Sequence, residues 1–156
     1  MSFRSTLAVA SGALLIASPA AAGEKIPNDM ARCTGNGTAV LATVRGIKQA
    51  QGTMRVQSYR ATKTDWLKKG RWLKRIDVQA AAGTMRFCIP VDAPGRYAIA
   101  VRHDLNGNGK TDIFSDGGGM SNNPSISVWN LGKPSYKKVA FQVDGRTAIR
   151  IDMKYM

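Results

Sequence analysis

The chain has 156 residues, a length that suits one domain with a buried core. Its 23 lysines and arginines outnumber 10 aspartates and glutamates, which gives a formal net charge of +13 at pH 7. A field of this size attracts polyanions, but charge alone does not identify the partner, and specific nucleic-acid recognition is not expected. One histidine and two cysteines are too few for a zinc cluster.

Residues 1–22 have the pattern of a secretory signal peptide. Arg4 precedes an apolar run at 7–17, and three alanines at 20–22 satisfy the small-residue rule for cleavage. A membrane anchor is the disfavoured alternative, because a spanning helix needs roughly 18 or more apolar residues. We therefore expect a mature chain that begins near Gly23, lies in the periplasm or is secreted, and has no transmembrane segment.

Export decides how the two cysteines are interpreted. Cys33 and Cys88 would meet an oxidising compartment, which favours one disulfide over two buried thiols. The bond would close a loop of about 55 residues, and the chain-entropy estimate for such a disulfide is a stabilisation of the folded protein by about 4 kcal/mol. Residues 23–37 are rich in Pro, Asn, Gly and Thr, so we expect a lead-in segment that Cys33 tethers to the domain at 38–156.

Alternating apolar and polar residues predict short strands in the rest of the chain. They are expected at residues 38–47, 53–60, 72–80, 84–89, 96–103, 136–143 and 147–155. Residues 104–135 form a long loop with no predicted strand or helix, and segments of that length are more often functional than idle. The fold class is therefore all-β, a single antiparallel β-sandwich of about seven strands, Ig-like or transthyretin-like.

Residues 63–75 form the densest basic run, in which two tryptophans lie among six basic residues. Exposed aromatic side chains between basic ones can stack on bases or sugar rings. The favoured alternative is a solvated segment whose tryptophans anchor it to the core. The candidate binding residues are Trp66, Lys68, Lys69, Arg71 and Trp72.

The loop after the strand at 96–103 reads D-x-N-x-N-G-x-x-D, which places oxygen donors at positions 1, 3, 5 and 9 of an EF-hand-like calcium loop. Gly109 supplies the sharp turn at position 6. Position 12, a glutamate in an EF-hand, is Ser115, and Asp116 is the nearest replacement. A polar turn between strands explains the same residues, and both interpretations stay open. The candidate calcium ligands are Asp104, Asn106, Asn108, Lys110 through its carbonyl, Asp112 and Asp116.

His103 is the only histidine and precedes Asp104, with Ser115 and Ser121 further on. A histidine oriented by a carboxylate near a hydroxyl is the arrangement of a hydrolase triad. Neighbouring strand residues point to opposite faces, however, and the chain has no nucleophile-elbow motif. A packed histidine at a strand end is the favoured interpretation.

The stretch 94–112, PGRYAIAVRHDLNGNGKTD, followed by GMSNN at 119–123, resembles the exported bacterial family called domain of unknown function 2141. The resemblance spans roughly residue 38 to the C-terminus. Family members carry Gly-x-Pro-x-Glu between the two motifs, whereas this chain has residues 114–119, FSDGGG, so Asp116 is the acidic group left there. The start of the strand at Gly95 is also similar to transthyretin-like and carboxypeptidase-regulatory-type sandwiches.

We therefore expect an exported, non-enzymatic β-sandwich protein with a structural calcium loop. The expected partner is an anionic envelope or extracellular component, that is, a glycan, lipopolysaccharide or lipid. The alternatives are a hydrolase that uses His103 and a structural module for protein–protein interaction. The sequence does not predict the oligomeric state.

Overall fold

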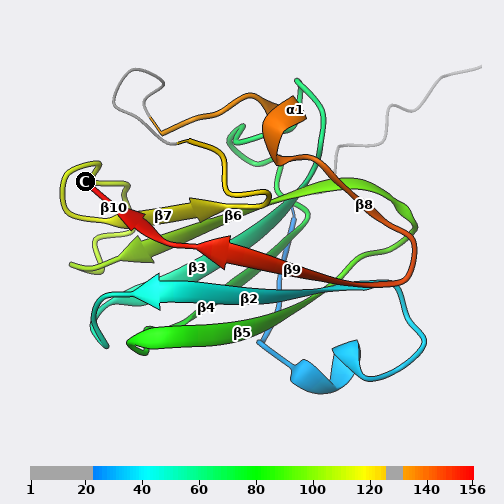
Figure 1. Ribbon diagram of the computed structural model, residues 1–156, viewed down its shortest axis with the longest axis horizontal. Coiled ribbons are helices and arrows are strands. Elements are labelled where there is room, and N and C mark those ends of the chain that lie inside the picture. Colours follow the sequence, from blue (N-terminus) through cyan, green and yellow to red (C-terminus); the bar gives the residue numbers. More distant parts are fainter. Residues whose placement is uncertain (1–22, 126–131) are drawn as a thin grey trace, which may run out of the picture.

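The computed structural model describes residues 23–125 and 132–156, so the predicted signal peptide lies outside the described part. Strands dominate this part, and no helix in it is long and apolar enough to cross a membrane (Figure 1). The elements are β1 (Glu24–Lys25), the 3-10 helix η1 (Met30–Cys33), β2 (Ala39–Ile47), β3 (Thr53–Arg60), β4 (Lys74–Gln79), β5 (Gly83–Pro90), β6 (Gly95–Asp104), β7 (Gly117–Met120), α1 (Tyr136–Val139), β8 (Phe141–Val143), β9 (Arg146–Asp152) and β10 (Lys154–Tyr155).

The strands form two sheets. The larger follows the order β1-β4-β3-β6-β7-β10, with β8 also paired to β6, and the smaller follows β5-β2-β9. The all-β prediction is confirmed. The purely antiparallel arrangement is wrong, because β2 pairs with β9 in parallel and β1 pairs with β4 in parallel. Parallel neighbours need a long crossover, and here the chain between β2 and β9 passes through β3, β4, β6, β7 and β8 of the larger sheet.

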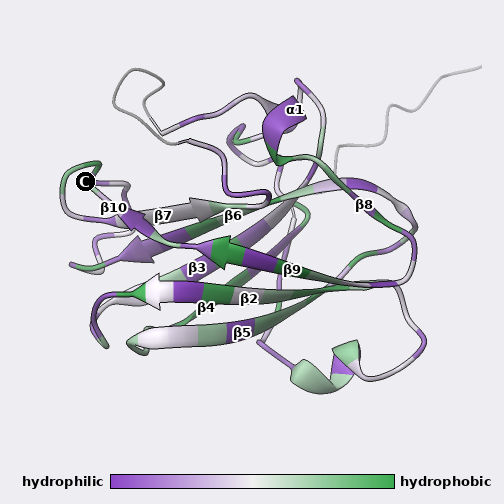
Figure 2. Cartoon of the chain, in the orientation of Figure 1, coloured by the Kyte–Doolittle hydropathy of each residue, from purple (hydrophilic) through white to green (hydrophobic). Residues whose placement is uncertain are grey.

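One apolar core lies between the sheets. Val40, Val44 and Phe87 of the smaller sheet and Val56 and Ile99 of the larger sheet are fully buried in it. Their neighbours along each strand point outward, and hydrophilic bands alternate with hydrophobic ones along β2, β5 and β9 (Figure 2). The period-2 pattern in the sequence therefore indicates a sandwich-like arrangement in which each sheet contributes one apolar face to the shared core.

A second apolar cluster covers the outer face of the larger sheet. Tyr59 and Ala98 on that face pack against Trp66 and Val139, which come from the two segments that cross over it. Trp66 meets the Tyr59 ring edge to face, with 5.4 Å between ring centroids. The second cluster fixes residues 61–72 and α1 to the sheet.

Several segments differ from the sequence prediction. Glu24–Lys25 of the lead-in segment form β1, and the strand expected at 147–155 is divided into β9 in the smaller sheet and β10 in the larger. Residues 117–120, expected to be loop, form β7 against β6, because strand pairing requires backbone groups and not a hydrophobic pattern. Residues 136–143, expected to be one strand, form α1 and then β8. The Ser135 side chain accepts a hydrogen bond from the Lys137 amide and starts the helical turn, and Val139 joins the second cluster.

The predicted disulfide is confirmed. Cys33 and Cys88 are bonded, with 5.8 Å between their Cα atoms. The bond holds η1 against the outer face of the smaller sheet beside Ala39. Asn28 strengthens the attachment, since its side chain donates to the Arg86 carbonyl (2.9 Å) and accepts from the Cys88 amide (3.1 Å).

Candidate functional site

The loop that follows β6 is organised by Asp104. This side chain is buried, and its Oδ2 accepts from the Gly109 amide (2.8 Å) and from Nη2 of Arg102 (3.4 Å). Gly109 has φ of +76°, as its place in the turn requires. Asp104 Oδ1 is buried and has no hydrogen-bond partner in the part of the chain that is described. An unpaired carboxylate oxygen in a buried place is costly unless a cation or donor reaches it.

Asp112 and Asp116 close the same loop. Asp112 Oδ2 accepts from the side-chain amides of Asn106 (2.9 Å) and Asn108 (2.7 Å), and these bonds hold the pKa of Asp112 below its ordinary value. Asp116 accepts from the amides of Leu105 (3.2 Å) and Asp112 (2.9 Å). The side chains predicted as calcium ligands are thus joined in one hydrogen-bonded loop.

The side-chain oxygens of the two asparagines are occupied by the turn itself. Asn106 accepts from the Asn108 amide (3.0 Å), and Asn108 accepts from the Lys110 amide (2.7 Å). Across residues 23–125 and 132–156, no group of three or more His, Cys, Asp or Glu is placed to hold a metal ion. Cation binding would therefore require the asparagine amides to turn their oxygens inward.

His103 is fully buried and both of its ring nitrogens are engaged. Nδ1 lies 2.7 Å from the Tyr155 hydroxyl and Nε2 lies 2.7 Å from the Gln51 carbonyl. Burial raises the pKa of Tyr155. Asp104 makes no hydrogen bond to His103, because the two neighbours point to opposite faces of β6. His103 thus links β6 to β10 and to the turn before β3.

The Ser121-Asn122-Asn123 motif joins three parts of the fold. Ser121 Oγ accepts from the Ile99 amide (3.0 Å) and donates to the Val139 carbonyl (2.6 Å). Asn122 donates to the Ala140 carbonyl (2.9 Å). Asn123 donates to the Arg150 carbonyl (3.0 Å) and accepts from the Asp152 amide (2.7 Å), so its side chain occupies the free edge of β9.

The candidate binding residues in the basic run divide into two groups. Trp66 is buried and donates from Nε1 to the Pro134 carbonyl (2.8 Å), and Trp72 packs partly against the same cluster. Arg71 donates to Asp65 (2.7 Å). Lys68 and Lys69 remain exposed. The tryptophans therefore anchor the segment, as the favoured interpretation held.

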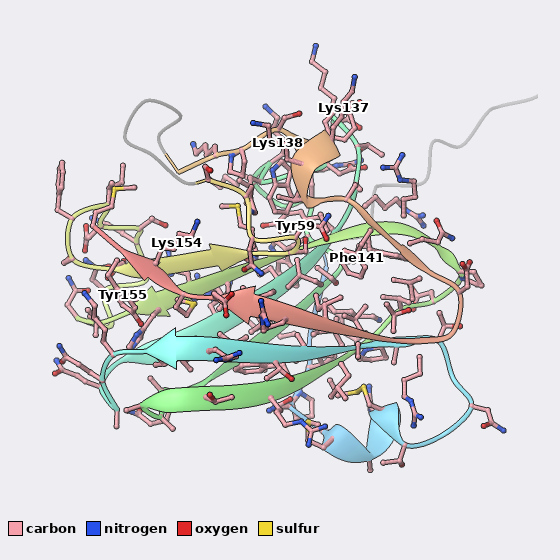
Figure 3. All side chains as sticks on the ribbon, viewed as in Figure 1. Tyr59, Lys137, Lys138, Phe141, Lys154 and Tyr155 are labelled. Atoms are coloured by element: carbon pink, nitrogen blue, oxygen red, sulfur yellow. A yellow bond between two sulfur atoms is a disulfide. The ribbon has the colours of Figure 1, made fainter. Side chains whose placement is uncertain are left out.

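Trp66 brings a second basic segment beside the first. Pro134, its partner, lies 68 positions away in the sequence. Figure 3 shows Lys137 and Lys138 on α1, next to the segment that carries Lys68 and Lys69. We call the six exposed lysines of these two segments the lysine patch: Lys63, Lys68, Lys69, Lys133, Lys137 and Lys138.

The lysine patch has little internal neutralisation. Asp65 is the one acidic residue in its two segments as far as they are described, and it is buried. The Thr62 hydroxyl and then the Arg71 guanidinium hold the pKa of Asp65 below its ordinary value, despite the opposing effect of burial. The Asp65 carboxylate is therefore already paired with Arg71 and does not neutralise the positive charge of the six lysines.

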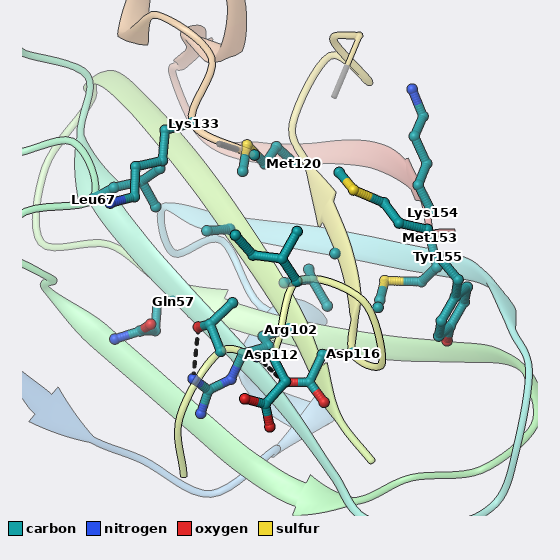
Figure 4. Close-up of a pocket in the computed structure, with 18 of the residues that line it drawn as sticks. Gln57, Leu67, Arg102, Asp112, Asp116, Met120, Lys133, Met153, Lys154 and Tyr155 are labelled. Carbon is teal, nitrogen blue, oxygen red and sulfur yellow. Dashed lines mark hydrogen bonds between the residues drawn. The ribbon is translucent and has the colours of Figure 1, made fainter. Parts of the chain in front are cut away.

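A cavity of about 740 Å³ lies between the lysine patch and the loop at 105–116 (Figure 4). Leu67 and Lys133 line one part of it, and Arg102, Asp112 and Asp116 lie together in another part (Figure 4). Burial lowers the pKa of Arg102, whose Nη1 donates to Thr111 (2.9 Å). Of the features that the sequence singled out, the acidic loop lines the cavity through Asp112 and Asp116, and the basic run lines it only through Leu67.

Sequence reasoning missed the contribution of residues 132–138 to the patch. The signal was present in Lys133, Lys137 and Lys138, but these were assigned to a loop and a strand. Their position beside Lys68 depends on the contact between Trp66 and Pro134, which joins segments far apart in the sequence.

Fold and site together define an all-β, two-sheet domain with an acidic turn and an exposed lysine patch. The chain belongs to the bacterial family described as "Uncharacterized protein conserved in bacteria (DUF2141)", which matches residues 42–150. This match includes the loop at 104–116, the Ser121-Asn122-Asn123 motif and Cys88, and it excludes Cys33. Neither the curated proteins nor the solved structures include a match to the chain.

Proposed function

We propose that this protein is an exported, non-enzymatic binding protein whose lysine patch engages an anionic component of the cell envelope, such as a glycan, lipopolysaccharide or lipid. The observation that carries the proposal is the convergence of six exposed lysines from two distant segments around the buried Trp66. Positive charge gathered on one surface speeds the encounter with a polyanion and strengthens its binding.

The engagement of His103 and Ser121 supports a non-enzymatic function. A general base needs a nitrogen that can reach a substrate or nucleophile, and both His103 nitrogens face groups of the fold. Ser121 is likewise bonded to two backbone groups. The hydrolase alternative predicts esterase or amidase turnover that His103→Ala abolishes, and we expect no such turnover.

The alternative of sheet-edge pairing has less support. A partner strand would need free backbone groups at an edge. In the smaller sheet, the Asn28 side chain bonds the edge of β5, and the Asn123 side chain bonds the edge of β9. These side chains occupy the groups that an added strand would use.

The lysine patch is tested by removing its charge. The double variant K137Q/K138Q should weaken binding to anionic lipopolysaccharide or lipid vesicles several-fold and reduce its salt dependence. The matched control K25Q/K110Q removes the same charge from β1 and the acidic loop. Equal weakening by both variants, or binding that does not change with salt, would reject the patch and leave only a general charge effect.

We infer as a second part of the proposed function that calcium orders the loop at 104–116. The unpartnered Oδ1 of the buried Asp104 supports this, because a cation would satisfy it. Calorimetric titration of metal-stripped protein should show calcium binding and a higher melting temperature, and D104N/D112N should remove both effects. The control D92N/D144N removes two acids elsewhere. No heat and no stabilisation at millimolar calcium would identify the loop as a polar turn.

A further inference from the structure

The outer face of the smaller sheet carries a cluster of arginines that the proposed function does not use. In the middle strand, Thr43 pairs with Arg86 of β5 on one side and with Arg150 of β9 on the other. Val44 is fully buried, so its neighbours Thr43 and Arg45 point away from the core. Arg45, Arg86 and Arg150 thus surround Thr43, and we call these four residues the arginine face.

Strand geometry fixes the spacing of the three arginines. Neighbouring strands lie about 4.8 Å apart, so the Cα atoms of Arg86 and Arg150 are about 10 Å from each other across β2. Arg45 is two residues beyond Thr43 and therefore about 7 Å further along the sheet. The long arginine side chains can converge from these three corners on one group held above the Thr43 hydroxyl.

Carboxylates neutralise little of this charge. Asp152 lies 3.5 Å from Nε of Arg150, and both side chains are largely exposed. Neither Arg45 nor Arg86 pairs with a carboxylate of the described residues. Arg146, further along β9, donates to the Cys33 carbonyl and adds a fourth positive charge to the same face. Four arginines and one aspartate therefore give this face a net positive charge, which a bound anion would neutralise.

The face lacks the side chains for other kinds of recognition. Its uncharged positions are small or aliphatic, including Leu41, Thr84 and Ala148, with no aromatic ring for stacking on bases or sugars. The two large exposed hydrophobic residues of the described chain, Phe114 and Met156, lie outside the smaller sheet, in the loop before β7 and after β10. Recognition at this face therefore depends on charge, through arginines held on the strands of a sheet.

We propose that the arginine face binds the phosphomonoester headgroup of an anionic lipid. A phosphomonoester carries close to two negative charges at neutral pH and has three strong acceptor oxygens, which match three arginine corners. Guanidinium groups bind such oxygens in pairs, whereas an ammonium acts as a point charge. η1 covers one end of this face, but the three arginines beyond it are exposed, which suits a group displayed on a membrane surface. This site is separate from the lysine patch and adds selectivity that the patch does not provide.

The test compares vesicles that contain phosphatidic acid, a monoester, with phosphatidylglycerol vesicles of equal surface charge. Wild-type protein should bind the monoester vesicles several-fold more tightly at the same ionic strength. The variant R86Q/R150Q should abolish this preference. R86K/R150K, which keeps the charge and loses the paired geometry, should also lose most of it.

The lysine-patch variant K137Q/K138Q separates the two proposals. The lysine patch and the arginine face lie on the outer faces of different sheets. K137Q/K138Q should therefore weaken the binding that both kinds of vesicle share and leave the preference for the monoester vesicles in place. If R86Q/R150Q removes the preference for monoester vesicles and K137Q/K138Q changes binding to neither kind of vesicle, the lysine-patch proposal is rejected and the arginine-site proposal stands. Equal wild-type affinity for the two vesicles, or a preference that survives R86Q/R150Q, would overturn the arginine site. Calorimetric binding of inorganic phosphate as tight as vesicle binding would reassign it to a free anion.

Discussion

The Ser121 hydroxyl satisfies two backbone groups in the interior, one on β6 and one at the end of α1. Ser121 is fully buried, so its removal leaves the Ile99 amide hydrogen and the Val139 carbonyl without these partners. We expect Ser121→Ala to lower the free energy of unfolding by about 1–3 kcal/mol, measured by urea denaturation. Ser115→Ala, at an exposed position, should change it by less than about 0.5 kcal/mol. Equal effects would show that the two bonds contribute no net stability.

Asp77 on β4 should produce a pH dependence of stability. Burial alone would raise its pKa, but hydrogen bonds from Arg75 (2.8 Å) and Arg55 (2.7 Å) hold the pKa below the ordinary value. A pKa that is lower in the folded state gives stability that is complete above the unfolded value of about 3.9 and disappears as pH falls through the folded value.

Thermal melts of wild type and Asp77→Asn should measure this dependence. The difference in melting temperature should be constant above about pH 5 and should shrink as the pH falls below about 4. A difference that stays constant through the acid range would mean that the charge of Asp77 contributes nothing, and that the substitution acts through packing alone.

At the scale of elements, β7 depends on glycine at alternate positions. A Cβ at Gly119 would lie 2.7 Å from Cγ2 of Ile151, and a Cβ at Gly117 would overlap the Tyr155 ring. At Gly118, on the outer face, a Cβ would meet no atom within 4 Å. The strand therefore approaches β9 and β10 through its inward glycines.

Alanine substitutions along β7 should separate these positions. Gly119→Ala should lower the free energy of unfolding by about 1–3 kcal/mol through overpacking. Gly118→Ala should be neutral within about 0.5 kcal/mol, or slightly stabilising because it restricts the unfolded chain. Chemical denaturation measures both variants under the same conditions. A Gly118→Ala cost equal to that of Gly119→Ala would attribute both effects to strand flexibility.

The elements that the sequence predicted are those with an alternating pattern. The expected strand at 53–60 is β3 itself, and the strand at 96–103 corresponds to β6 within one residue at each end. Of the strands that were not predicted, β7 has three glycines and no hydrophobic alternation, and β1 has only two residues. At 136–143 the alternation of Val139 and Val143 suggested a strand, although a local hydrogen bond from the Lys137 amide to the Ser135 side chain starts a helical turn there.

The candidate sites were predictable only where they are local. The acidic loop at 104–116 is one continuous stretch, so the spacing of its residues was enough to predict its oxygen donors. The lysine patch needs the contact between Trp66 and Pro134, and the arginine face needs the register of β2 with β5 and β9. Neither fact is encoded in a short window of sequence, because both arise from pairing between distant segments.

At the scale of the whole molecule, the acids and bases are distributed unequally. All ten acidic residues lie in the described part, and each accepts a hydrogen bond or pairs with a base. The lysine patch and most of the arginine face have no such partner. Two separate regions, a Lys-rich one and an Arg-rich one, therefore carry a large part of the excess charge of the molecule.

The lead-in segment links the two sheets. β1 pairs with β4 of the larger sheet, and a few residues later Cys33 is bonded to Cys88 of the smaller sheet. We expect C33A/C88A to lower the free energy of unfolding by about 4 kcal/mol, because the disulfide closes a loop with a sequence separation of 55. Urea denaturation of the variant and of reduced wild type should agree. A loss below about 1 kcal/mol would mean that β1 and Asn28 hold the segment in place without the covalent bond.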